Sequence, residues 1–111
     1  MKTVSEIWEF EKSINPVRYM RENPGVSFDE AIQERNRKIC EFCTAEEYAI
    51  SELAKCDINV DLALIVYSVK SAFPSVKGKQ ITAWALANAE KHHEIFAPNA
   101  WIKGGKLEIP D

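Results

Sequence analysis

The sequence lacks several features that would assign it to a specialised class of proteins. Its longest apolar run, Leu62 to Tyr67, falls far short of the roughly 20 residues that cross a bilayer. Glu6, Glu9 and Glu11 stand where a signal peptide needs an apolar core. The three cysteines are an odd number, which favours a reducing compartment over a disulfide framework. We therefore expect a cytoplasmic protein with no membrane partner.

A strong charge of one sign is also missing. The formal net charge is -3, and the acidic excess lies in the first half of the chain. The longest basic interval without an acidic residue contains only Lys70, Lys77 and Lys79, whereas a protein that binds phosphates usually has a basic patch. The fractions of 46% hydrophobic and 28% charged residues are typical of a globular protein. The composition predicts one folded domain over residues 1–111 and does not favour nucleic acid as a partner.

Helix start and stop signals are frequent and divide the chain into short helices. Ser5 can cap a first helix, and Asn15, which precedes a proline, can cap a second one. Ser27 and Thr44 each precede a glutamate by three residues, and these capping boxes predict two helices that meet near Cys43. A single long helix over the same stretch also fits the apolar spacing. The expected helices cover about residues 5–13, 16–22, 28–43, 44–56, 60–73 and 79–96.

The fifth of these segments, residues 60–73, is apolar at nearly every position. So thin a polar stripe is typical of a helix at the centre of a bundle. The run Leu62 to Val69 also fits a buried strand, but it is long for a strand and no comparable strand exists to pair with it. We therefore predict a mainly α fold, a compact bundle of five or six short helices around this central helix. Short apolar runs on either side of Gly104 and Gly105 add a small C-terminal β-hairpin.

A CxxC motif, Cys40 to Cys43, is the most conspicuous candidate metal or redox site. Two thiolates at this spacing can bind zinc or exchange disulfides. Cys56 and His92 could complete a zinc site, although the spacings match no zinc finger or zinc ribbon and the motif lies in a predicted helix. A zinc-stabilised domain with ligands Cys40, Cys43, Cys56 and His92 is therefore our third hypothesis, and we expect no cofactor.

Catalytic motifs are incomplete. Glu90 and His93 form one Glu-x-x-His pair, but the second half of a di-iron site is missing. The segment from Lys77 to Gln80 lacks the first glycine and the Ser or Thr of a phosphate-binding loop. No nucleophile has a base with a recognisable flanking signature. We expect a protein that is not an enzyme.

Four polar residues fall on otherwise apolar helix faces when each expected helix is laid out at ~100° per residue. Glu11 lies on the first helix, Arg35 on the third, and Asn88 with His92 on the sixth. An unpaired buried charge costs several kcal/mol, so Arg35 and Glu11 must be paired, neutralised or exposed. In one interpretation, Asn88 and His92 satisfy each other and Arg35 reaches a carboxylate or the edge of the core. In the other, these faces remain uncovered and bind another protein or a second copy of the chain.

The absence of catalytic and phosphate-binding motifs favours a small non-enzymatic protein-binding module, such as an accessory regulator, an inhibitor or an immunity-type protein. Arginine and tryptophan are common anchors at protein interfaces. The expected partner-binding residues are Arg35, Trp84, Asn88, His92 and Trp101.

The string Trp-Ile-x-x-Gly-Lys-Leu at residues 101–107 resembles the end of the recognition helix in excisionase-like and MerR-like helix-turn-helix domains. The resemblance covers seven residues and implies a DNA-binding regulator, our second hypothesis. Those families follow the string with a basic wing, whereas residues 108–111 here are Glu, Ile, Pro and Asp. The Gly-Gly signal favours a hairpin in its place. In the DNA-binding alternative, the phosphate contacts would come from Lys77, Lys79, Lys103 and Lys106.

Overall fold

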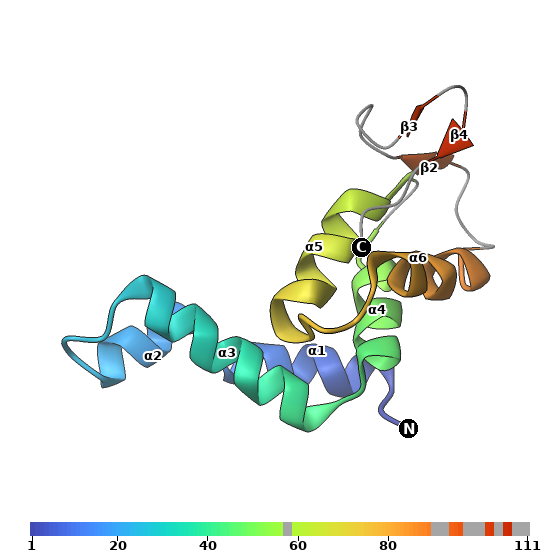
Figure 1. The fold of residues 1–111 in the computed structure, drawn as a ribbon. Coiled ribbons are helices and arrows are strands. Elements are labelled where there is room, and N and C mark those ends of the chain that lie inside the picture. Colours follow the sequence, from blue (N-terminus) through green and yellow to red (C-terminus); the bar gives the residue numbers. More distant parts are fainter. Residues whose placement is uncertain (57–58, 90–93, 97–101, 104–105, 108–111) are drawn as a thin grey trace.

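The computed structural model of the protein describes residues 1–56, 59–89, 94–96, 102–103 and 106–107, and this part of the chain is mainly helical, as predicted (Figure 1). None of its helices has the length and apolar character needed to cross a membrane. The helices are α1 (Val4–Ser13), α2 (Pro16–Glu22), α3 (Phe28–Phe42), α4 (Ala45–Ala54), α5 (Leu62–Ala72) and α6 (Gly78–Ala87). The short strands are β1 (Asn59–Asp61), β2 (Glu94–Phe96), β3 (Ile102–Lys103) and β4 (Lys106–Leu107).

Local capping signals explain the starts of α2, α3 and α4. The Asn15 Oδ1 atom accepts the backbone N–H of Val17 at 2.8 Å, with proline at the first helical position. The Ser27 side chain accepts an N–H group in the first turn of α3. Thr44 and Glu47 form a reciprocal capping box at the start of α4. The prediction of two helices, α3 and α4, in place of one long helix is therefore confirmed.

Two predicted caps are wrong by two residues. Thr3 caps α1, since its side chain accepts the backbone N–H of Glu6, and Ser5 lies inside the first turn. Asp61 caps α5 by accepting an N–H group of the first turn at 3.1 Å. The expected cap Asn59 is instead the first residue of β1, and this strand continues to Asp61 before α5 begins.

The sixth helix is shorter than predicted. It ends at Ala87, and Glu94–Phe96 forms strand β2, which pairs in parallel with β1. Asn88 is the C-cap, and its side-chain amide donates to the Trp84 carbonyl at 2.8 Å. An asparagine side chain that binds the backbone in this way competes with helix continuation. The predicted helix face that joined Trp84, Asn88 and residues 95–96 therefore does not exist.

The two strands β3 and β4 pair in antiparallel register, with Ile102 opposite Leu107 and Lys103 opposite Lys106. The turn at residues 104–105 lies outside the described residues. The complete C-terminal hairpin, and its packing on the helices, stays a prediction.

Helices α4 and α5 share the centre of the bundle. α4 packs on α1, α5 and α6, and α5 packs on α3, α4 and α6. α4 can pack on several sides because it buries small residues, Ala45, Ala49 and Ser51, beside the large Tyr48 and Leu53. A single central helix is therefore not confirmed. The largest fully buried apolar side chains are Tyr48, Ile7, Ile39, Leu62, Ile81, Val60 and Val69.

Helix α2 and the part of α3 opposite it project from this bundle, as Figure 1 shows at the left of the view. We call this projection, residues 16–38, the arm. α2 contains no buried residue and makes its extensive contacts with α3 alone. Gly25 has a φ of 95° in the turn between the two helices, a conformation that favours glycine. The arm is thus a helical hairpin with most of its surface in contact with solvent.

Candidate functional site

A chain of polar contacts runs through the protein from α1 to α3 and includes both charged residues singled out on apolar faces. The Glu11 carboxylate accepts a hydrogen bond from Lys55 at 2.7 Å, and Lys55 also contacts Glu52 at 3.3 Å. Glu52 carries a negative charge close to the buried Tyr48 hydroxyl. That hydroxyl in turn accepts a hydrogen bond from Arg35 Nη2 at 3.4 Å. We call these five residues the polar chain. It pairs Glu11 with a lysine, as the cost of burying a lone charge requires.

Tyr48 is the neutral link in the polar chain. Burial raises the pKa of its hydroxyl, and the nearby negative charge of Glu52 raises it further, although Arg35 acts in the opposite direction. The hydroxyl therefore stays protonated at physiological pH. It can accept from the Arg35 guanidinium and donate to the Glu52 carboxylate at the same time.

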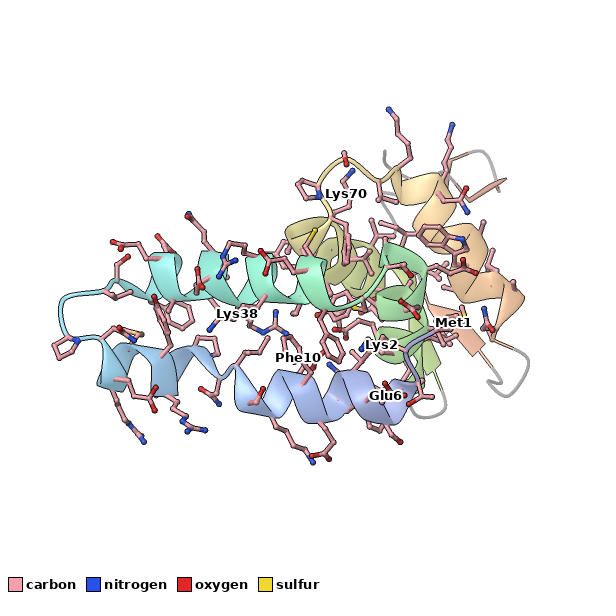
Figure 2. The ribbon with its side chains drawn as sticks, turned by 90° about the horizontal axis from the view of Figure 1, so that it is seen from below. Met1, Lys2, Glu6, Phe10, Lys38 and Lys70 are labelled. Atoms are coloured by element: carbon pink, nitrogen blue, oxygen red, sulfur yellow. The ribbon has the colours of Figure 1, made fainter. Side chains whose placement is uncertain are left out.

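A pocket of about 100 Å³ lies at the base of the arm, between residues of the ranges 13–22 and 31–38. We call it the arm pocket. Arg35 contributes to its wall and is half-buried. The Lys38 ammonium lies 5.5 Å from the ring centroid of Tyr19, and Figure 2 shows Lys38 on the side of α3 that faces α2. The pocket is therefore bounded by cationic and aromatic groups from both helices of the arm.

Cationic side chains outnumber carboxylates among the residues that line the arm pocket. Arg18 pairs with Glu22 at 3.0 Å, and Lys38 lies 4.0 Å from Glu34. The pKa of Glu34 is lowered, mainly by a hydrogen bond from Arg37, so this carboxylate is ionised and fully engaged. None of the ion pairs found in the described ranges involves Arg35. The pocket therefore has a cation that is not matched by a carboxylate.

Other predicted partner-binding residues lie away from this pocket. Trp84 is half-buried in α6 and packs against the core, while Asn88 is exposed at the end of that helix. Neither residue lines the arm pocket, and α3 and α6 do not pack extensively on each other. His92 and Trp101 lie outside the described residues. The structure therefore does not bring Arg35 and Trp84 into one site.

The three cysteines of the zinc hypothesis lie in the described part of the chain, whereas the fourth expected ligand, His92, does not. Cys40 is exposed, Cys43 is buried at the end of α3, and Cys56 is half-buried after α4. No group of three His, Cys, Asp or Glu residues in the described part of the chain is placed to hold a metal ion. Burial raises the pKa of Cys43 to about 11, so its thiol is protonated at neutral pH and is a poor ligand and nucleophile.

The structure describes the exposure of two lysines of the DNA-binding alternative and only the backbone pairing of the other two. Lys77 and Lys79 are exposed at the start of α6. Lys103 and Lys106 face each other in the backbone register of β3 and β4. The nearby Lys70, labelled in Figure 2, donates to the Val76 carbonyl at 3.0 Å and so helps to fasten the turn before α6.

Sequence reasoning missed the partners of Arg35 and Glu11. Tyr48 and Glu52 lie four residues apart on α4, and Lys55 follows three residues later, so helical spacing alone could have placed all three on one side of that helix. A further pocket, lined by Trp8, Glu11, Lys12 and Lys55, opens at the α1 end of the polar chain. The Trp8 indole N–H donates to the Ser51 carbonyl at 3.2 Å and ties α1 to α4.

The N-terminal residues are fastened to the bundle by a second set of contacts. The backbone N–H of Lys2 donates to the buried Glu47 carboxylate. The Lys2 ammonium lies 4.3 Å from the ring centroid of Phe42, which stacks on Phe10 with 4.0 Å between ring centroids. Figure 2 shows Lys2 and Phe10 along this side of α1. These contacts hold α1 against the end of α3 and the start of α4.

The described side chains provide charge, hydrogen-bond donors and exposed surface. No family model, curated protein or solved structure matches this chain.

Proposed function

We propose that the protein is a non-enzymatic, cytoplasmic protein-binding module that contacts its partner through the arm. The observation that carries the proposal is that the rest of the protein buries only part of the apolar face of α3. Ala31 and Ile39 on this face are buried, but Phe28 is exposed and Ile32 and Arg35 are only half-buried. The bundle covers the C-terminal end of the face and α2 covers part of the rest, whereas Phe28 at its N-terminal end stays exposed to a partner.

The packing of α2 supports the same proposal. A helix of seven residues is marginal by itself, and α2 contributes no buried residue to the core. The arm therefore contributes little to the stability of the bundle through burial. It presents apolar and charged groups on a projecting hairpin, an arrangement suited to recognition of another protein.

The test is capture of a partner from lysate of the native host by wild-type protein and by two matched variants. Phe28 is 56% exposed in the arm and Leu64 is 58% exposed on α5, so the two side chains differ mainly in location. We expect Phe28→Ala to reduce recovery of the captured protein about tenfold, because apolar anchors at interfaces are worth more than about 1 kcal/mol. Leu64→Ala should leave recovery unchanged, and both variants should keep the wild-type helical signal.

Equal recovery with Phe28→Ala and Leu64→Ala would show that the arm is not the contact surface. Binding that weakens steeply with salt and recovers DNA would favour the DNA-binding alternative. Turnover of a substrate by the purified protein would contradict a purely binding role.

A further inference from the structure

Arg35 has unused hydrogen-bonding capacity in the wall of the arm pocket. A guanidinium carries five N–H donors and remains charged at any physiological pH. Arg35 Nη1 donates to Asn36 Oδ1 at 3.2 Å, and Nη2 donates to the Tyr48 hydroxyl at 3.4 Å. The other N–H groups have no acceptor within the described ranges of the chain. A half-buried guanidinium with spare donors is suited to a planar anion that can accept two of them.

The pocket is locally positive in a protein whose net charge is -3. Glu22 is engaged by Arg18 and Glu34 by Lys38 and Arg37, so neither carboxylate compensates Arg35. Glu52 does not line the pocket and pairs with Lys55 at 3.3 Å. The excess positive charge at the pocket therefore belongs to Arg35.

The size of the pocket restricts what can enter it. About 100 Å³ is several times the roughly 10–15 Å³ of such space that one water molecule needs. A carboxylate with one or two methylene groups fits this space. Ile14 and Ala31 also line the pocket and provide apolar contact for methylene groups.

We propose that the arm pocket receives an aspartate or glutamate side chain of the partner, with its carboxylate on Arg35, so that the arm recognises an acidic segment of another protein. This inference rests on the proposed function and names the chemistry of the partner. The Tyr48 hydroxyl accepts a hydrogen bond from Arg35 and so helps to orient its guanidinium in the pocket wall, and Arg35 is the group that contacts the partner.

The experiment is a selection from a displayed library of random peptides with the full-length protein as bait, followed by affinity measurements on the enriched peptides. We expect the enriched peptides to share one acidic position. Replacement of that acid by its amide should weaken binding to wild-type protein about ten- to hundred-fold, as expected for charge-assisted hydrogen bonds. When the protein is the Arg35→Gln variant, the same replacement in the peptide should weaken binding less than about threefold, because the guanidinium that the acid would contact is already absent.

Two further variants separate recognition from general charge and from folding. Arg21→Gln removes an exposed arginine of α2 that does not line the pocket, and it should bind like wild type. Arg35→Lys keeps the charge but loses the planar fork, so its affinity should lie between those of wild type and Arg35→Gln. If Arg35→Gln loses the helical signal, the comparison of Arg35→Lys with Arg21→Gln carries the test.

The outcomes distinguish the inference from the proposed function. Enriched peptides that need Phe28 but have no shared acid would overturn the carboxylate assignment and leave the binding function in place. Absence of any peptide whose binding depends on Phe28 or Arg35 would overturn both. Displacement of bound peptide by inorganic phosphate but not by acetate would identify a phosphate site. Concentration-dependent dimerisation that Phe28→Ala abolishes would identify a second copy of the chain as the occupant.

Discussion

Replacement of Tyr48 by phenylalanine removes one oxygen atom from the middle of the polar chain and leaves the buried ring in place. Tyr48 is 1% exposed, so water cannot take the place of the hydroxyl without rearrangement. Hydrogen bonds to charged groups contribute about 1.5–3 kcal/mol each. The contact with Arg35 is long, at 3.4 Å, and Arg35 is half-buried, so this contact contributes little. We expect Tyr48→Phe to lower the free energy of unfolding at pH 7 by about 1–2 kcal/mol, because the charged neighbours Arg35 and Glu52 both lose this polar group.

The same substitution changes the response of stability to alkaline pH. The folded state raises the pKa of Tyr48 above its ordinary value of 10.0, mainly by burial. Above about pH 10 the unfolded chain loses this proton while the folded protein keeps it, so the wild-type protein loses stability as pH rises. The slope from this one group approaches about 1.4 kcal/mol per pH unit. Tyr48→Phe lacks this contribution, and its stability deficit relative to wild type should therefore shrink above pH 10.

Urea unfolding followed by far-UV circular dichroism at pH 7, 9 and 11 measures both effects. Tyr67→Phe is the matched control, because Tyr67 is 73% exposed and its hydroxyl should be worth less than about 0.5 kcal/mol. A Tyr48→Phe protein as stable as wild type at pH 7, together with an unchanged dependence on alkaline pH, would refute the role of the hydroxyl in the polar chain.

Three further outcomes can be measured on the same material. Thr3→Ala should destabilise the protein by about 1 kcal/mol in urea unfolding because Thr3 caps α1, whereas Ser5→Ala should change stability by less than about 0.5 kcal/mol. The backbone N–H of the cap residue lowers the pKa of Glu47, so the stability that this carboxylate provides should be present above pH 4.5 and be lost as pH falls. A Glu47→Gln protein should lack that part of the acid sensitivity in urea titrations at pH 3–7. Exposed Cys40 should be alkylated by iodoacetamide in the folded protein, whereas Cys43, whose pKa burial raises to about 11, should react only after unfolding; mass spectrometry would locate the label.

The sequence predicts those parts of the fold that local chemistry decides. Asn15, Ser27 and Thr44 mark real helix starts because a cap needs only an acceptor and an N–H group two or three residues away. The end of α6 depends on a different kind of contact. Residues 94–96 pair with residues 59–61. A helical pattern in one segment contains no information about a pairing partner more than 30 residues away.

In the candidate site too, local sequence predicts some features, whereas others depend on the packing of distant segments. The helical period places Arg35 on an apolar face, which identifies it as a residue that needs an explanation. Its contact with Tyr48 depends on how α4 packs against α3, and that orientation arises from the whole core. Glu11 and Lys55 similarly meet across 44 positions of sequence. Asn88 was misplaced because the helix that was expected to carry it ends one residue earlier.

The arm also affects how the chain folds. The contact between Trp8 and Ser51 joins residues 43 positions apart, and residues 16–42, α2 and α3, lie within the loop that this contact closes. Loop closure becomes less unfavourable as the effective loop shortens, by about 0.6 kcal/mol for each halving of its length. When α2 folds back on α3, the start of α2 and the end of α3 turn toward the same region, so α1 and α4 meet across a much shorter effective loop. The hairpin that projects from the finished bundle therefore favours early docking of α1 on α4 during folding.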